Sequence, residues 1–278
     1  MYTLNCKGRL LTVDKPLVMG IINATPDSFY EGSRFMGEHG ILQQAEQMLK
    51  AGANILDIGG QSTRPNSTAV PAEEELQRVT GAIESLHYNF PDAIISIDTY
   101  FAKVAAGAVA AGASIVNDIS AGTIDTNMLT TVGSLQVPYV CTHMRGTPAT
   151  MHQFTQYENV TREVLDFFIE KIQACRQAGI TDLILDPGFG FAKTPVHNFT
   201  LLQHLAVFNV LEKPILVGVS RKSTIYKTLG ITAAEALNGT TVLNTIALMH
   251  GAHILRVHDV KEAREAIKLV EQIKGALA

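Results

Sequence analysis

The sequence has 278 residues, of which 46% are hydrophobic, and a formal net charge of −4 at pH 7. This charge predicts no binding to nucleic acid or to an acidic membrane surface. No apolar run is long enough to span a bilayer, and residues 1–16 lack the core of a signal peptide. Three scattered cysteines without metal-ligand spacing are typical of a reducing compartment, so we expect a cytoplasmic protein.

The predicted elements begin with a short β-hairpin and continue as alternating strands and helices. Residues 1–16 place Gly8 between two β-like runs, which predicts a hairpin at the bottom of the fold. Eight short runs rich in Ile, Val and Leu follow, as expected of strands buried on both faces. These runs are residues 17–23, 54–60, 93–98, 114–118, 139–144, 183–188, 214–220 and 254–259. Segments of helical length lie between them, for example 41–51, 73–87 and 158–178.

An internal repeat supports this alternation. Four segments share a pattern in which a glycine comes shortly before a strand: AGANILDIGG, AGASIVNDIS, AGITDLILDPG and HGAHILRVHD. Their glycines, Gly52, Gly112, Gly179 and Gly251, can end a helix in the left-handed conformation. The four units lead into the second, fourth, sixth and eighth strands. The sequence therefore predicts one α/β domain over residues 1–278, a (βα)8 TIM barrel, with an open doubly wound sheet as the alternative.

Polar residues follow the predicted strands where each strand ends. In a barrel all eight of these ends face one rim, so we expect their side chains to form a single cavity. The set comprises Asn23, Gln61, Ser62, Thr63, Arg64, Asp98, Asn117, Asp118, His143, Asp186, Ser220, Arg221, Lys222, Ser223, Arg256 and His258. A turn or helix cap would explain any one of them, and an ion-pair network closing the barrel mouth would explain the set. Convergence of all of them favours a binding site.

The charges within this set separate by sign. Phosphate oxygens suit the donors Arg64, Lys222, Arg256 and His258, with help from Ser62, Thr63 and Ser223. The acceptors or mixed groups are Asp98, Asn117 and Asp186, and we expect them to lie deeper. This arrangement predicts a substrate with a donor-rich heterocycle at one end and a phosphate or diphosphate at the other.

Two other features have simpler interpretations. Cys141 and His143 share a strand face, but a packed thiol and a hydrogen-bonded histidine are expected there rather than a zinc site. The run Gly188-Phe189-Gly190 lacks the third glycine of a dinucleotide-binding motif. It predicts a tight turn, with Phe191 as a stacking wall.

Eight motifs, in order and over nearly the whole chain, resemble those of the bacterial dihydropteroate synthase family. They are MGIINATPDSF, GGQSTRP, ISIDTY, IVNDIS, THMRGTP, ILDPGFGFAK, LVGVSRKS and LRVHDV. The resemblance implies a βα barrel that joins 6-hydroxymethyl-7,8-dihydropterin diphosphate to 4-aminobenzoate and releases diphosphate with Mg²⁺ present.

The resemblance also implies roles for individual residues. Asn23 would be the Mg²⁺ ligand. The pterin would lie among Asp98, Asn117, Asp186 and Lys222, and the diphosphate among Thr63, Arg64, Arg256 and His258. The 4-aminobenzoate slot would be shaped by Phe29, Pro65, Phe191 and Ser223. Members of the family commonly form homodimers through their outer helices.

The chemistry inferred from the residues agrees with these roles. Breaking the C–O bond loads negative charge on the diphosphate, and Lys222, Arg256, His258 and Mg²⁺ would stabilise it as the catalytic groups. An aromatic amine is a neutral nucleophile at pH 7, so no strong general base is required. Two alternatives are the pterin-binding domain of a corrinoid-dependent methyltransferase and a non-catalytic pterin-binding protein.

Three positions depart from the usual family pattern. Glu31 stands where Asp is common, and Gln61 stands where Glu is common. Thr142 replaces an apolar residue of the pterin pocket. We expect Thr142 to make the pterin wall slightly more polar.

Overall fold

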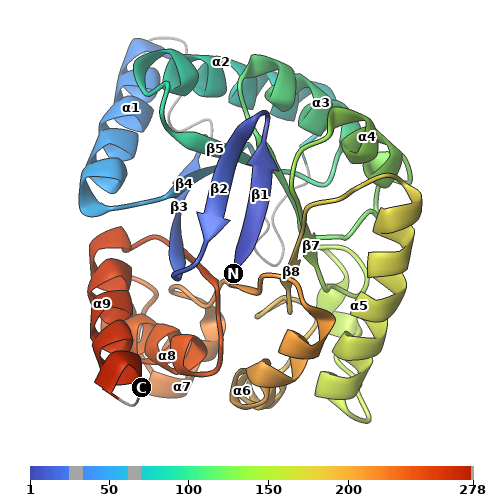
Figure 1. The fold of residues 1–278 in the computed structure, drawn as a ribbon, viewed down its shortest axis with the longest axis vertical. Helices are drawn as coiled ribbons and strands as arrows, with labels where there is room; N and C mark the ends of the chain where they lie inside the picture. Colours follow the sequence, from blue (N-terminus) through green and yellow to red (C-terminus); the bar gives the residue numbers. More distant parts are fainter. Residues whose placement is uncertain (25–33, 62–69, 277–278) are drawn as a thin grey trace.

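The chain folds into a closed barrel of parallel strands surrounded by helices. The computed structural model describes residues 1–24, 34–61 and 70–276 (Figure 1). Eight strands are hydrogen-bonded in the order β8-β7-β6-β5-β4-β3-β10-β9, and a parallel bridge between Leu185 and Ile215 joins the two edges. The predicted TIM barrel is therefore confirmed, and the open doubly wound sheet is wrong.

The barrel strands lie where the apolar runs predicted them, but most are shorter. They are β3 (Leu17–Asn23), β4 (Ile55–Gly59), β5 (Ile94–Asp98), β6 (Ile115–Asp118), β7 (Tyr139–Thr142), β8 (Leu183–Asp186), β9 (Leu216–Val217) and β10 (Ile254–Val257). The largest difference is at β9, which pairs with β10 at only two positions. A turn in which Lys222 N donates to Val219 O ends this strand early.

The helices form a ring around the strands (Figure 1). They are α1 (Arg34–Ala51), α2 (Ala72–Asn89), α3 (Ala102–Ala111), α4 (Met128–Leu135), α5 (Val160–Gln177), α6 (Pro195–Gln203), α7 (Ser223–Leu229), α8 (Leu237–Met249) and α9 (Val260–Ala276), with the 3-10 helices η2 (Met151–Gln153) and η3 (Leu205–Leu211). The four repeat glycines follow α1, α3, α5 and α8 and have positive φ, as the repeat predicted. Among the described residues, no helix has the length and apolar character of a membrane span.

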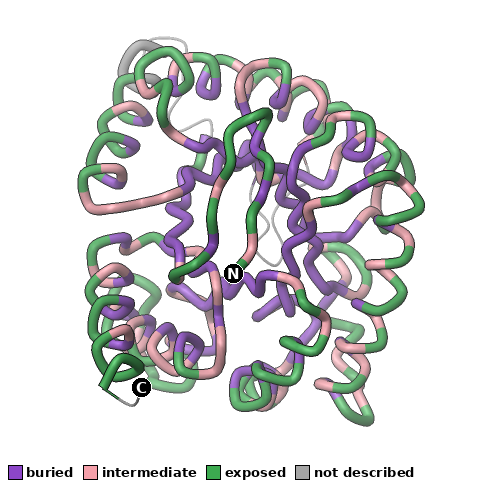
Figure 2. The backbone as a smooth tube through the Cα atoms, viewed as in Figure 1, coloured by how far each residue is buried: buried purple, intermediate pink, exposed green. Residues whose placement is uncertain are grey.

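The barrel interior changes from apolar to polar along each strand. A lower layer of apolar side chains fills the bottom: Leu17, Met19, Ile55, Ile94, Ile115, Val140, Ile184, Leu216 and Ile254. Successive side chains of a strand point to opposite faces, so residues two positions further along point inward again. Those positions hold mostly polar groups: Asp57, Ser96, Asn117, Thr142, Asp186 and Arg256. The strands are the most deeply buried part of the chain (Figure 2).

The N-terminal hairpin covers the apolar end of the barrel. Strands β1 (Tyr2–Cys6) and β2 (Arg9–Val13) pair antiparallel and lie across one end of the barrel (Figure 1). Leu4, Cys6 and Val13 pack on the lower layer of barrel side chains. The predicted hairpin is confirmed, and the polar residues are left to the opposite end.

A glycine in α4 allows a close approach between neighbouring helices. An ideal Cβ at Gly133 would lie 1.8 Å from the carbonyl oxygen of Ala178, directly after α5. Gly133→Ala should therefore force the helices apart and lower the free energy of unfolding by about 1–3 kcal/mol. The matched control is Gly81→Ala in α2, where an ideal Cβ meets no atom within 4 Å. That change should stabilise the protein by about 0.5–1 kcal/mol in urea unfolding. A stabilised Gly133→Ala variant would contradict the contact.

Candidate functional site

A buried arginine lies between two carboxylates at the polar end of the barrel. Arg256 on β10 places Nε 2.6 Å from Asp57 Oδ2 and Nη2 2.6 Å from Asp98 Oδ2. Asp57 Oδ2 also accepts a hydrogen bond from Asn117 Nδ2 at 2.9 Å. Strands β4, β5, β6 and β10 thus contribute to one network. The structure brings together three predicted site residues, Arg256, Asp98 and Asn117, and Asp57 links them.

Asp57 was missed by the sequence prediction. It lies in the middle of the apolar run ILDIG, whereas the prediction considered polar residues only at strand ends. Its side chain is 0% exposed. A lone carboxylate inside an otherwise apolar parallel strand was the available signal, because such a charge must be paired.

Two carboxylate oxygens of this network have no partner among the residues that the structure describes. Asp57 Oδ1 and Asp98 Oδ1 are buried, and neither accepts a hydrogen bond from the part of the chain that the structure describes. Burial raises the pKa of Asp98 to about 7, and the charge of Arg256 opposes this rise. Buried acceptors are normally satisfied, so two such atoms in one network suggest a donor outside the described residues.

A second group forms around the loop after β8. Asp186 Oδ1 accepts a hydrogen bond from Gly188 N at 2.8 Å. Lys222 donates to Phe189 O at 2.5 Å, and its Nζ lies 4.6 Å from the centre of the Phe191 ring. Burial lowers the pKa of Lys222 to about 8, although the carboxylate of Asp186 favours the charged form. Burial likewise raises the pKa of Asp186, and Lys222 opposes this rise. The Phe191 ring, the Lys222 side chain and the Asp186 carboxylate therefore lie in one region.

Lys193 forms hydrogen bonds to this loop, and the sequence prediction also missed it. Its Nζ lies 2.8 Å from His143 Nδ1 and 3.1 Å from the carbonyl oxygens of Gly188 and Phe191. Burial holds the pKa of His143 well below its usual value, and it also holds the pKa of Lys193 well below its own usual value. The expectation of a hydrogen-bonded His143 is met, and Cys141 is a buried free thiol.

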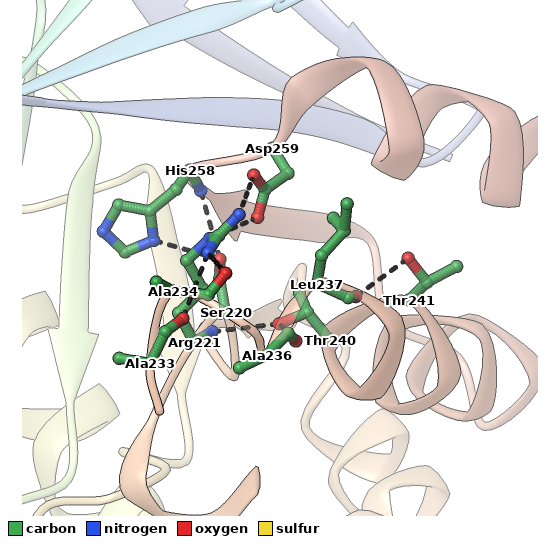
Figure 3. Close-up of polar contacts among 10 residues, drawn as sticks. All are labelled: Ser220, Arg221, Ala233, Ala234, Ala236, Leu237, Thr240, Thr241, His258 and Asp259. Carbon is green, nitrogen blue, oxygen red and sulfur yellow. Dashed lines mark hydrogen bonds and ion pairs between the residues drawn. The ribbon is translucent and has the colours of Figure 1, made fainter. Parts of the chain in front are cut away.

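The ends of β9 and β10 are tied to each other (Figure 3). His258 is exposed, and its Nδ1 lies 3.0 Å from Ser220 Oγ. Arg221 forms a two-pronged ion pair with Asp259, with both N···O distances 2.8 Å. The backbone N–H of Arg221 donates to Thr240 Oγ1 at 3.0 Å. Arg221 has φ +51°, a conformation uncommon for a residue with a side chain. These bonds fix the segment that places Lys222 and Ser223, the first residue of α7.

The buried side-chain amide of Gln61, which follows β4, bonds two other side chains. Gln61 Nε2 donates to Glu75 Oε2 at 2.5 Å, and Tyr100 OH donates to Gln61 Oε1 at 3.0 Å. Burial raises the pKa of Glu75 to about 7, and the charge of Asp98 acts in the same direction. These two hydrogen bonds therefore fix the orientation of the Gln61 side-chain amide. Its position fixes the chain directly before residues 62–69.

The remaining predicted residues lie in different surroundings. Asn23 ends β3, is exposed, and pairs in register with Gly59 of β4. Four predicted binding residues and one departure from the family pattern lie outside the described residues: Phe29, Thr63, Arg64, Pro65 and Glu31.

Comparisons with known proteins place this geometry in context. The family model described as "Pterin binding enzyme" matches residues 19–258. The dihydropteroate synthase of Escherichia coli K12 is 43% identical over 272 residues, covering 97% of this chain and 96% of that protein. A structure of Xanthomonas albilineans dihydropteroate synthase with 4-aminobenzoic acid superposes with a TM-score of 0.90, at 40% identity and 98% coverage of both chains. A structure from the same organism, in complex with 7,8-dihydropteroate, gives a TM-score of 0.86, at 35% identity and 98% coverage of both chains.

The ion pair of Asp57 should contribute far more to stability than an exposed one. Asp57→Asn removes one of the two charges that balance the buried guanidinium of Arg256, so the free energy of unfolding should fall by about 3 kcal/mol. The matched control is Asp92→Asn, which removes the 97% exposed partner of Arg9. This change should alter the free energy of unfolding by less than about 0.5 kcal/mol. Urea unfolding of both variants measures the difference. Equal effects would show that burial of the Asp57 pair is unimportant.

Titration of Glu75 should make stability depend on pH. Burial raises its pKa in the folded protein from 4.5 to about 7, so the folded state holds a proton that the unfolded state releases between these values. The stabilisation is complete below pH 4.5 and is lost as the pH rises through 7. Relative to Glu75→Gln, the wild type should lose about 3 kcal/mol over this range. Parallel curves for the two proteins in urea unfolding would contradict the raised pKa.

Proposed function

Because the chain belongs to the dihydropteroate synthase family of pterin-binding enzymes, we propose which of its side chains carry out each part of that reaction. The enzyme is a transferase that joins 6-hydroxymethyl-7,8-dihydropterin diphosphate to 4-aminobenzoate and releases diphosphate. The observation that carries the proposal is a pair of carboxylate oxygens, on Asp57 and Asp98, that have no partner among the described residues and lie near the cations Arg256 and Lys222.

The pterin ring binds deepest, against Asp98, Asn117 and Asp186. The ring has N–H donors along one edge, and carboxylate oxygens accept from them. Asp98 Oδ1, which no described residue bonds, supports this placement. Arg256 bonds both Asp57 and Asp98. If Asp98 turns to a pterin donor, Asp57 still holds the guanidinium in place.

The diphosphate lies against Arg256, His258 and Lys222, with Thr63 and Arg64 completing the set. Cleavage of the C–O bond transfers charge to the diphosphate, and fixed cations stabilise that charge where it develops. Lys222 lies close to Asp186 and Asp98, so it bridges the pterin and diphosphate regions. The nucleophilic amine is neutral at pH 7, and the reaction proceeds without a strong general base.

Mg²⁺ fits the exposed amide of Asn23. Mg²⁺ keeps most of its waters and binds proteins through one or two oxygen ligands together with substrate phosphates. Asn23 supplies such an oxygen at the polar end of the barrel, and no cluster of three metal-binding side chains occurs in residues 1–24, 34–61 and 70–276. When bound, the ion would neutralise charge on the diphosphate.

The 4-aminobenzoate slot lies between Phe191 and Ser223, with Phe29 and Pro65 completing the set. Phe191 is 9% exposed and has the ammonium of Lys222 over its ring. An aromatic wall beside a cation suits a flat ring that carries a carboxylate.

We infer that residues 1–278 act as one domain and that two copies form a homodimer through outer helices. Exposed apolar side chains support this interface on α6, η3 and α8: Val196, Phe199, Val210, Val242 and Met249. All three cysteines are buried free thiols, in keeping with a cytoplasmic location.

Diphosphate release tests the site. The wild type should release diphosphate only when both pterin diphosphate and 4-aminobenzoate are present, unlike a methyltransferase domain or a silent binding protein. Asp186→Ala leaves ring donors unpaired and should lower kcat/KM by about 2–4 kcal/mol of transition-state stabilisation. Asp182→Ala, directly before the same strand and bonded to the hairpin, is the matched control and should retain activity. Near-normal kcat/KM in Asp186→Ala would refute the pterin assignment.

A further inference from the structure

A buried hydroxyl at the end of β7 lacks a hydrogen-bond partner among residues 1–24, 34–61 and 70–276. Thr142 is 1% exposed, and its Oγ1 contacts no donor or acceptor in the described part of the chain. Removing a hydroxyl from water without replacing its hydrogen bonds costs free energy in the ligand-free protein. Such a group is uncommon in a folded protein, so its position needs an explanation.

The position of Thr142 relates it to the pterin site. Val140 belongs to the lower apolar layer, so Thr142, two residues further on, points to the same inner side of the barrel. Its register partner on the neighbouring strand is Asp186, just as Val140 pairs with Ile184 of the same lower layer. The unpartnered hydroxyl therefore lies beside the carboxylate assigned to the pterin.

Asp186 and Thr142 have complementary hydrogen-bonding capacity. An ionised carboxylate only accepts hydrogen bonds, whereas a hydroxyl can also donate one. A pterin edge alternates N–H donors with ring nitrogens and a carbonyl oxygen that accept. The carboxylates of Asp98 and Asp186 cannot match those acceptors when ionised, so donors must come from other side chains of the wall.

We propose that Thr142 is a specificity-determining residue whose hydroxyl donates to a pterin ring acceptor next to the N–H group bound by Asp186. This inference rests on the proposed pterin site. Binding of the ring satisfies the hydroxyl, so its desolvation cost is present only in the free enzyme. A site with this donor discriminates against ring analogues that have C–H in place of the accepting nitrogen.

The test uses a variant that should weaken pterin binding and at the same time stabilise the ligand-free protein. Thr142→Val has nearly the same shape and removes the hydroxyl, and Thr142→Ser keeps it. Calorimetric titration with 6-hydroxymethyl-7,8-dihydropterin should show affinity about five- to tenfold weaker for Thr142→Val and near wild type for Thr142→Ser. The melting temperature of ligand-free Thr142→Val should rise, because an unsatisfied polar group is gone.

A matched control lies on α5. Thr161 Oγ1 is also buried without a partner among the described residues, but it lies on an outer helix. Thr161→Val should raise the melting temperature and leave pterin affinity unchanged.

Two results would overturn the inference. Wild-type pterin affinity in Thr142→Val would show that the hydroxyl makes no bond to the ring. A lower melting temperature in that variant would show that the hydroxyl is already satisfied in the free protein. Asp186→Ala separates these outcomes from failure of the site itself, since unchanged pterin binding there would reject the whole pterin assignment.

Discussion

The guanidinium of Arg256, held between Asp57 and Asp98, is the interaction on which the rest of the site depends. Three charges and the amide of Asn117 meet where water is largely excluded, and each keeps the others in position. A buried pair of this kind adds little net stability compared with apolar side chains of equal size. Its contribution is a set of charges fixed before any ligand arrives, which is the arrangement that stabilises developing charge most effectively. Among the described residues, the same network leaves Asp57 Oδ1 and Asp98 Oδ1 without a hydrogen-bond partner.

The alternation of side chains along each strand places an apolar layer and a polar layer on the same inner side of the barrel. Ile55, Ile184 and Ile254 fill the lower layer, and Asp57, Asp186 and Arg256 stand two residues beyond them on the same inner side. Stability and chemistry therefore come from the same strands at different heights. A shift of one residue in any strand would place its polar group among the surrounding helices.

Much of this arrangement could be predicted from the sequence, and the exceptions have physical causes. Asp98, Asn117 and Asp186 were found because each closes an apolar run, and parallel strands bring such ends to one rim. Asp57 was missed because it lies inside its run, where only the closed barrel reveals a partner nearly 200 residues away in the chain. Lys193 was missed for a similar reason, since its contact with His143 joins loops that follow different strands. The limits of β9 depended on a turn that composition does not indicate. The fold thus followed from local pattern, whereas the pairing of charges required long-range geometry.

The hairpin that covers the apolar end also bears on how ligands reach the site. Strands β1 and β2 pack over Leu17, Met19 and their neighbours, so the apolar end of the barrel is covered. We therefore expect both substrates to enter, and both products to leave, at the polar end. In the arrangement proposed above, a ring at Asp186 lies beneath a ligand held against Phe191 and Ser223. The proposal therefore implies that the deeper ligand arrives first and that the coupled product leaves before another turnover begins. A barrel covered at one end thus favours a fixed order of ligand binding and release, which a channel open at both ends would not require.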